Sequence, residues 1–326
     1  MTQRAGSPVI GLALGSGGAR GWCHVGVLRG LEELGIRPAV VSGCSMGALV
    51  GAAHAAGCLD ALEDWARALT LPRFLNLIEI DLAGGGLVGG KAIADLLQQI
   101  GAPARIEDLR LPFRAVASDM ATGREIWLKS GPLASAVQAS AALPGVLGPV
   151  YRDGRWLLDG GMTNPVPVTI ARALGADVVI AVNPDAHLMS GRIRRAVHAR
   201  AAPSPLRAVA AELAGRLPAM GLGALSGLLV PPDSRAGDRA GNPADDRNGS
   251  RAPGYFTVVN AAINMMTDEI RRSRLAGDPP HVLLNARLDD IRVYELYRAE
   301  EAIEEGRRMV MRHRESLCAM LEDRAG

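Results

Sequence analysis

The chain of 326 residues is long enough to bury a substantial core, as one large domain or as two smaller ones. Its net charge of +2 is too small for a nucleic-acid-binding surface, and aromatic residues make up only 3% of it. Four cysteines, Cys23, Cys44, Cys58 and Cys318, follow neither a metal-binding spacing nor a disulfide framework. These features predict an aliphatic core, a reducing compartment and no metal site.

Nothing in the chain is expected to cross a membrane. The first eight residues lack the apolar stretch of a signal peptide. Two uncharged runs, residues 38–59 and 130–151, are long enough to suggest a transmembrane helix. The first run contains four glycines, and Pro132, Pro144 and Pro149 interrupt the second. We therefore expect a cytoplasmic protein.

In chain order, the first part of the sequence alternates strands and helices. Strands are expected at residues 8–14, 39–41, 113–118, 125–129, 156–158 and 176–182. Helices are expected at residues 22–34, 48–53 and 92–100. This alternation predicts an α/β fold with a largely parallel sheet.

The composition changes after Asn183. Residues 192–200 are basic, residues 206–230 are apolar, and residues 231–253 have almost nothing to bury, which predicts a disordered loop. Helices follow at residues 256–275 and 293–317, with a strand at residues 281–285. We therefore divide the chain into a core of residues 1–185, a variable insertion of residues 186–255 and a C-terminal helical segment of residues 256–326 that packs on the core.

Residues 43–47 form the pentapeptide G-x-S-x-G, with Ser45 at its centre. A short β-branched strand precedes it and a helix follows, which is the setting of a nucleophile elbow. Gly43 and Gly47 permit a strained turn that leaves the Ser45 hydroxyl exposed at its tip. In α/β-hydrolases the elbow follows several strands, so its early position here argues against that fold.

The first strand ends in a second glycine-rich turn, residues 15–21. It departs from the dinucleotide-binding G-x-G-x-x-G pattern because Arg20 stands at the third glycine position. It also lacks the Gly-Lys-Ser/Thr ending of a phosphate-binding loop. Backbone N–H groups at a helix start suit a developing anion, which favours an oxyanion hole. The alternative is a tight turn without a catalytic role.

The serine requires a base, and no histidine is well placed. His24 suits packing or bracing of the loop, and His281 is the best of the later candidates for a triad. The other histidines lie in a helix, in the variable region or on the terminal helix: His54, His187, His198 and His313. Asp159 ends a short strand before two glycines. An Asp-Gly pair alone usually marks a turn, but beside the elbow it indicates the base of a Ser–Asp dyad, provided that burial raises its proton affinity.

Three motifs carry a family resemblance. Residues 17–21 (GGARG), 43–47 (GCSMG) and 159–161 (DGG) occur in the order and approximate spacing of the patatin-like phospholipases. The chain resembles most closely the short bacterial members related to neuropathy target esterase. Residues 141–144 (AALP) and 159–167 are similar to the block around the catalytic aspartate of that family. The resemblance covers residues 8–185, whereas residues 203–253 look like a long insertion.

The resemblance implies a three-layer α/β/α fold and hydrolysis of phospholipid or lysophospholipid esters through an acyl-enzyme, without metal or organic cofactor. Ser45 would be the nucleophile and Asp159 the base. The oxyanion would be held by the amides of five residues: Gly17, Gly18, Ala19, Arg20 and Gly21. The Arg20 side chain would brace this loop or face an anionic head group.

Other interpretations remain open at this point. An acyltransferase can share the elbow, although its usual histidine partner has no convincing candidate. A non-catalytic regulatory protein could keep the fold, but it would not need all three motifs. The lipid or ester substrate suggests peripheral contact with the inner face of a membrane through residues 192–230, with a helical cover on the core as the alternative. The sequence leaves the oligomeric state unknown.

Overall fold

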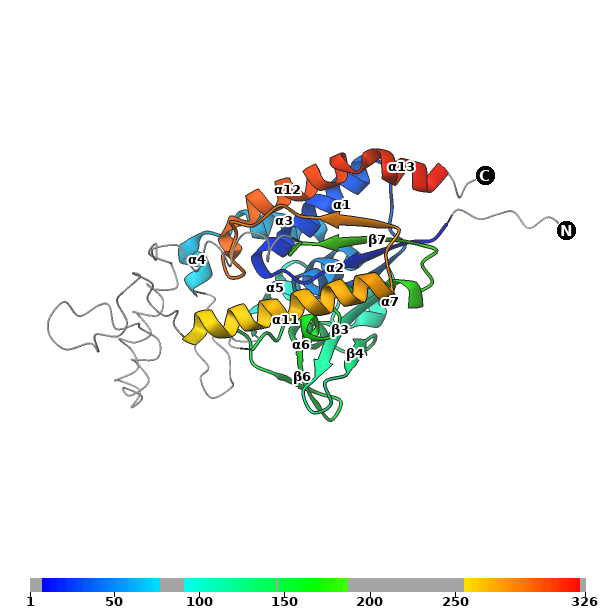
Figure 1. Cartoon of the computed structure of the whole chain (residues 1–326). Coiled ribbons are helices and arrows are strands. Elements are labelled where there is room, and N and C mark those ends of the chain that lie inside the picture. Colours follow the sequence, from blue (N-terminus) through cyan, green and yellow to red (C-terminus); the bar gives the residue numbers. More distant parts are fainter. Residues whose placement is uncertain (1–7, 77–90, 145, 187–254, 323–326) are drawn as a thin grey trace, which may run out of the picture. The chain divides into compact units, whose positions relative to one another are not determined.

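The computed structural model describes residues 8–76, 91–144, 146–186 and 255–322 (Figure 1). Its central feature is an eight-stranded sheet in which hydrogen bonds link the strands in the order β5-β6-β3-β2-β1-β7-β8. Strand β4 is also hydrogen-bonded to β3. The parallel strands are β1 (Ile10–Leu14), β2 (Val40–Cys44), β3 (Phe113–Asp119), β7 (Val178–Asn183) and β8 (Val282–Asn285). The antiparallel strands are β4 (Glu125–Leu128), β5 (Val150–Arg152) and β6 (Arg155–Asp159). The predicted α/β fold with a largely parallel sheet is confirmed.

Helices connect and cover these strands. They are α1 (Cys23–Glu33), α2 (Met46–Ala56), α3 (Leu59–Arg67), α4 (Leu71–Asn76), α5 (Lys91–Gln99), α6 (Leu133–Ser140), α7 (Val168–Ala173), α11 (Tyr255–Gly277), α12 (Ala299–Arg312) and α13 (Arg314–Glu322). Short 3₁₀ helices are η1 (Gly18–Trp22), η2 (Ile106–Asp108), η3 (Gly160–Met162) and η7 (Leu296–Arg298). The single helix expected over residues 293–317 is wrong, because α12 starts only at Ala299 and the helix is interrupted at His313 before α13 begins. Strand β5 was not expected.

Both faces of the parallel strands are buried, which explains their unbroken apolar runs. In β7, Ile180 and Val182 pack into a large core that includes side chains of α1, α2 and α12. The alternate residues Val179 and Ala181 pack on the opposite face with Val168 of α7. The sheet thus lies between two helical layers, as the three-layer expectation required (Figure 1).

The chain divides into two compact units, one of Met1–His187 with Met266–Gly326 and one of Leu188–Met265. In the first unit, β8 extends the sheet beside β7, and α12 covers α1. Residues 192–230, for which we expected membrane contact, lie outside the described residues. Among the helices that the structure describes, none is long and apolar enough to cross a membrane.

Helix α12 lies in backbone contact with α1. A Cβ atom on Gly26 would lie 1.7 Å from the carbonyl oxygen of Ile303, and one on Gly306 would lie 2.0 Å from that of Cys23. Gly30 lies one turn after Gly26 on the same face of α1, and a Cβ there would lie 2.8 Å from the side chain of Val310. Glycines on both helices therefore let the C-terminal segment lie directly on the helix that follows the glycine-rich loop.

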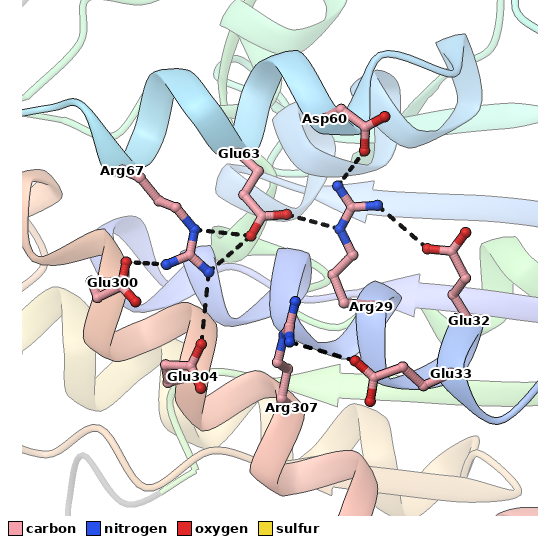
Figure 2. Close-up of polar contacts among 9 residues, drawn as sticks. All are labelled: Arg29, Glu32, Glu33, Asp60, Glu63, Arg67, Glu300, Glu304 and Arg307. Carbon is pink, nitrogen blue, oxygen red and sulfur yellow. Dashed lines mark hydrogen bonds and ion pairs between the residues drawn. The ribbon is translucent and has the colours of Figure 1, made fainter.

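Ion pairs join these two helices to α3 (Figure 2). The Glu63 carboxylate of α3 lies 2.8 Å from the guanidinium of Arg29 on α1 and 2.8 Å from that of Arg67 on its own helix. The network is completed by Arg29 with Glu32 and Asp60, Arg67 with Glu300 and Glu304, and Arg307 with Glu33. Because Glu63 and Arg29 are partly buried, this network holds α1, α3 and α12 together more firmly than isolated surface pairs would.

We predict that Gly26→Val destabilises the protein by about 3 kcal/mol or more, because the new side chain has to displace the backbone of α12. Urea unfolding of the full chain measures the change. The matched control is Gly277→Ala, whose Cβ meets nothing within 4 Å and whose stability should change by less than about 0.5 kcal/mol. Equal stability of Gly26→Val and wild type would show that the two helices do not touch.

Candidate active site

Ser45 lies in a strained turn between β2 and α2. Its φ of 54° and ψ of −120° make it one of two non-glycine residues with positive φ among the described residues. A Cβ on Gly47 would lie 2.2 Å from the carbonyl oxygen of Leu14, so α2 starts directly against the end of β1. On Gly43 a Cβ would lie 2.4 Å from the Gly47 carbonyl oxygen. The turn therefore has the geometry of a nucleophile elbow, with both glycines required.

Asp159 reaches Ser45 because two strands end against the same edge of β3. Strand β2 pairs with the first residues of β3 and stops with Cys44 opposite Val116. Strand β6 arrives from the other direction and stops with Asp159 opposite Ala117, the next residue along. Since β4 pairs with overlapping residues of β3, it occupies the other edge. The Cys44 Sγ lies 3.9 Å from Asp159 Oδ1, and the Ser45 hydroxyl is close enough to the same carboxylate to lower its pKa.

The Asp159 side chain is held in a nearly dry environment. The residue is 3% exposed, and burial raises the pKa of its carboxyl to about 6. The backbone N–H of Gly161, 2.7 Å from Oδ1, and the Ser45 hydroxyl oppose this rise, whereas the nearby charge of Asp185 adds to it. Burial thus supplies the increase in proton affinity that a carboxylate needs to act as a base near neutral pH.

The glycine-rich loop lies against both of these groups. A Cβ on Gly21 would lie 2.5 Å from the side chain of Met46, the residue after Ser45. On Gly161 a Cβ would lie 3.4 Å from the Ser16 hydroxyl oxygen. The structure therefore brings together the loop, the elbow and the Asp159 turn, which are far apart in the sequence.

Two of the five amides expected in the oxyanion hole have other acceptors. The Ala19 N–H donates to the Val293 carbonyl at 2.8 Å, and the Arg20 N–H donates to the Gly17 carbonyl at 3.1 Å. The N–H groups of Gly17 and Gly18, at the start of η1, have no acceptor among the described residues. Gly18 also needs its glycine, because φ is +52° and a Cβ would lie 2.4 Å from the Val293 carbonyl oxygen. Gly17 and Gly18 therefore provide the two N–H groups that suit the expected oxyanion hole, while Gly21 lies within η1.

Arg20 points into the protein and braces the loop. Its Nε donates to Asp185 Oδ1 at 2.5 Å and its Nη1 donates to the Ile291 carbonyl at 3.0 Å. Both side chains of the ion pair are buried. The bonds to Ile291 and Val293 attach the loop to a segment about 270 residues later in the chain. Of the two roles expected for Arg20, the geometry favours bracing.

The histidines lie in supporting positions. His24 is buried, and desolvation lowers the pKa of its imidazole to about 4. The neutral ring lies with Nε2 2.7 Å from the Gly15 carbonyl oxygen, where it braces the loop. His281 accepts the Val179 N–H at the start of β8, the opposite end of the parallel strands from Ser45. Among the described residues no histidine hydrogen-bonds to Ser45 or Asp159; His187 and His198 lie outside these residues.

Three contributors to the site were missed in the sequence. The Ser140 hydroxyl accepts the Ser45 N–H at 2.9 Å, and the Ala142 carbonyl accepts the Asp159 N–H at the same distance. The AALP block that starts at residue 141 was the signal for both, and Ser140 directly precedes it. Asp185, the partner of Arg20, had a weaker signal as an acidic residue just after a buried strand.

A surface recess of about 630 Å³ begins beside the Asp159 turn. It is lined by Met162 and Thr163, by the polar residues of β4 and the preceding turn, and by α11. No group of three or more metal-binding side chains occurs in the part of the chain that the structure describes. Burial raises the pKa of the Cys44 thiol, which keeps it protonated and unreactive.

Comparison with known proteins agrees with this arrangement. The family model of the patatin-like phospholipases matches residues 12–172. An uncharacterised NTE family protein of Mycobacterium tuberculosis is 34% identical over 323 residues, which cover 92% of this chain and 90% of that protein. Human patatin-like phospholipase domain-containing protein 6 is 35% identical over 181 residues, which cover 53% of this chain and 13% of the human protein. The chain therefore belongs to the patatin-like phospholipase family, among its NTE-related members.

Proposed function

We propose that the protein is a serine acyl hydrolase that cleaves fatty-acyl esters of phospholipids or lysophospholipids. Membership of the family supports lipid hydrolysis in general. The observation that carries the finer proposal is that the strained Ser45 turn lies beside the buried Asp159 carboxylate, with Cys44 Sγ 3.9 Å from Oδ1 and the Ser45 hydroxyl lowering the pKa of Asp159. We extend the proposal to a cytoplasmic location, in which the enzyme meets lipid from the aqueous side.

In the proposed mechanism, Ser45 Oγ attacks the ester carbonyl carbon while Asp159 accepts the hydroxyl proton. The N–H groups of Gly17 and Gly18 bind the oxyanion of the tetrahedral intermediate. When the intermediate collapses, Asp159 returns the proton to the departing alcohol oxygen, which leaves an acyl ester on Ser45. A water molecule then repeats the sequence, with Asp159 again as base, and releases the fatty acid.

An acyltransferase remains the alternative, in which an alcohol replaces that water. Among the described residues no histidine contacts the dyad to act as the usual partner of such an enzyme. A non-catalytic role would not require the strained φ of Ser45, which costs folding free energy. Both considerations favour hydrolysis.

We predict that a fluorophosphonate probe labels the wild-type protein and that Ser45→Ala abolishes the labelling, because the probe phosphonylates an activated serine hydroxyl with loss of fluoride. Ser130→Ala, at an exposed serine just after β4, is the control and should label normally. Mass spectrometry of the labelled peptide identifies the modified residue. An unlabelled wild type would contradict the proposed hydrolase.

We predict that hydrolysis of a soluble p-nitrophenyl ester falls on the acid side with an apparent pKa of about 6, because the reaction needs the deprotonated Asp159 carboxylate. Asp159→Asn should lower kcat by about 1,000-fold or more. His281→Ala should keep most of the activity, since this side chain lies at the far end of the sheet. A comparable loss in the histidine variant would restore a triad.

The same substitution should stabilise the fold above pH 7. The pKa of Asp159 is higher in the folded than in the unfolded state, so its charged form destabilises the folded state as pH rises through about 6. Asp159→Asn removes this cost, of order 3 kcal/mol at pH 8, and brings little gain below pH 4. Thermal unfolding at the two pH values measures the difference. A variant that is less stable at pH 8 would indicate that Asp159 serves the fold rather than catalysis.

The buried pair Arg20–Asp185 supports a further prediction. Asp185→Asn should lower kcat by about tenfold or more with little change in KM, because the loop amides lose their support. It should also move the acid limb to lower pH, since the charge of Asp185 raises the pKa of Asp159. A loss of kcat without this displacement would mean that the pair acts only on folding. The double variant Arg20→Gln/Asp185→Asn, which leaves no unpaired buried charge, controls for instability.

A further inference from the structure

Exposed aromatic side chains gather on the antiparallel part of the sheet, in a chain that has few aromatic residues. On the β5–β6 hairpin, Tyr151 is 61% exposed and Trp156 is 52% exposed. Their rings face each other across the two strands with centroids 5.1 Å apart. Met120, 60% exposed, lies beside them, because its N–H donates to the Trp156 carbonyl. We name Met120, Tyr151 and Trp156 the hairpin patch.

The hairpin patch lies at the edge of the sheet that bears the proposed active site. Asp159 is at the end of β6 that meets β2, and Trp156 stands three residues before it on the same strand. At the rise of a β-strand this separation is about 10 Å. The hairpin patch therefore lies on the same strand as Asp159, a short distance along the chain from the proposed active site.

The aromatic face of the hairpin is uncovered. Leu157 is buried in the large core on the face that α6 covers, so Trp156 and its cross-strand partner Tyr151 point to the opposite face. Among the described elements, the helix that packs closely against β5 and β6 is α6, which covers the other face. Exposed apolar side chains that cluster in this way mark an interaction surface more often than isolated ones do.

The exposed charged residues around the hairpin patch are two arginines and one aspartate. Arg155, next to Trp156, is exposed and also pairs with Asp119 at 3.6 Å. Arg124, at the turn before β4, is an exposed cation. Asp153, at the hairpin turn, is the exposed anion, while Asp119 is buried and accepts hydrogen bonds at the end of β3. Tryptophan and tyrosine are enriched where proteins meet the lipid–water boundary, and arginine is attracted to anionic head groups.

We infer that the hairpin patch is a docking surface for an anionic lipid layer, with Tyr151, Trp156 and Met120 at the level of the head groups and Arg155 beside them. This inference rests on the proposed lipid hydrolase and adds how that enzyme reaches its substrate. A second copy of the chain fits less well. Three half-exposed side chains offer roughly 300 Å², whereas a stable dimer buries about 800 Å² per partner.

The test measures binding of the full-length protein to sedimented vesicles of phosphatidylcholine with and without phosphatidylglycerol. All variants carry Ser45→Ala so that the vesicles stay intact. Tyr151→Ser/Trp156→Ser should weaken binding to anionic vesicles by about tenfold or more. Met120→Gln, which keeps the ring pair and thus the hairpin, should weaken it less. Met311→Ser, a comparably exposed methionine on α12, is the matched control and should bind as wild type.

The same substitutions in the active protein separate docking from catalysis. The hairpin-patch variants should hydrolyse a soluble p-nitrophenyl ester at the wild-type rate and vesicle lipid at least several-fold more slowly. Unchanged vesicle binding, a lower melting temperature of Met120→Gln, or a change from dimer to monomer in light scattering would each overturn the inference, the last in favour of a second copy. If the wild-type protein does not hydrolyse the soluble ester, that result would contradict the proposed function instead.

Discussion

The proposed site depends on how one strand, β3, is paired. One of its edges is shared end to end by β2 and β6, which run in opposite directions and stop at neighbouring residues of β3. This pairing sets Asp159 beside Cys44 and Ser45 although more than 100 residues separate them in the chain. The antiparallel hairpin is therefore a requirement of the site, because a parallel strand at this position would bring its start, not its end, to the elbow.

Burial of Asp159 provides the proton affinity on which the proposed dyad depends. A carboxylate this dry needs hydrogen-bond donors: the Gly161 N–H donates to it, and the nearby Ser45 hydroxyl also lowers its pKa. Their number is small enough to leave the pKa near 6, where the group can accept a proton from serine. The fold does not use His24 as a second base. The ring of His24 is neutral and contacts the Gly15 carbonyl oxygen, where it holds the glycine-rich loop.

The features that could be predicted from the sequence are those formed by residues close together in the chain. Each glycine-rich turn joins a strand to a helix within a few residues, so the elbow and the loop were visible as motifs. Strand β5 and the Ser140 contact depend on partners elsewhere in the chain, and a run of three strand residues has no pattern of its own. The break at His313 was hidden because apolar spacing continues across it from α12 to α13.

The contacts that brace the proposed oxyanion loop extend the site beyond residues 12–172, which match the family model. The family model ends at residue 172, whereas Asp185, Ile291 and Val293 lie after it. These residues are held in place by β7, β8 and the glycine contact between α12 and α1. Because Ala19 and Arg20 donate to them, the two free amides of Gly17 and Gly18 keep their direction only while the C-terminal segment is packed. The C-terminal segment is thus a structural part of the proposed active site, in a chain whose mycobacterial relative aligns over nearly its whole length.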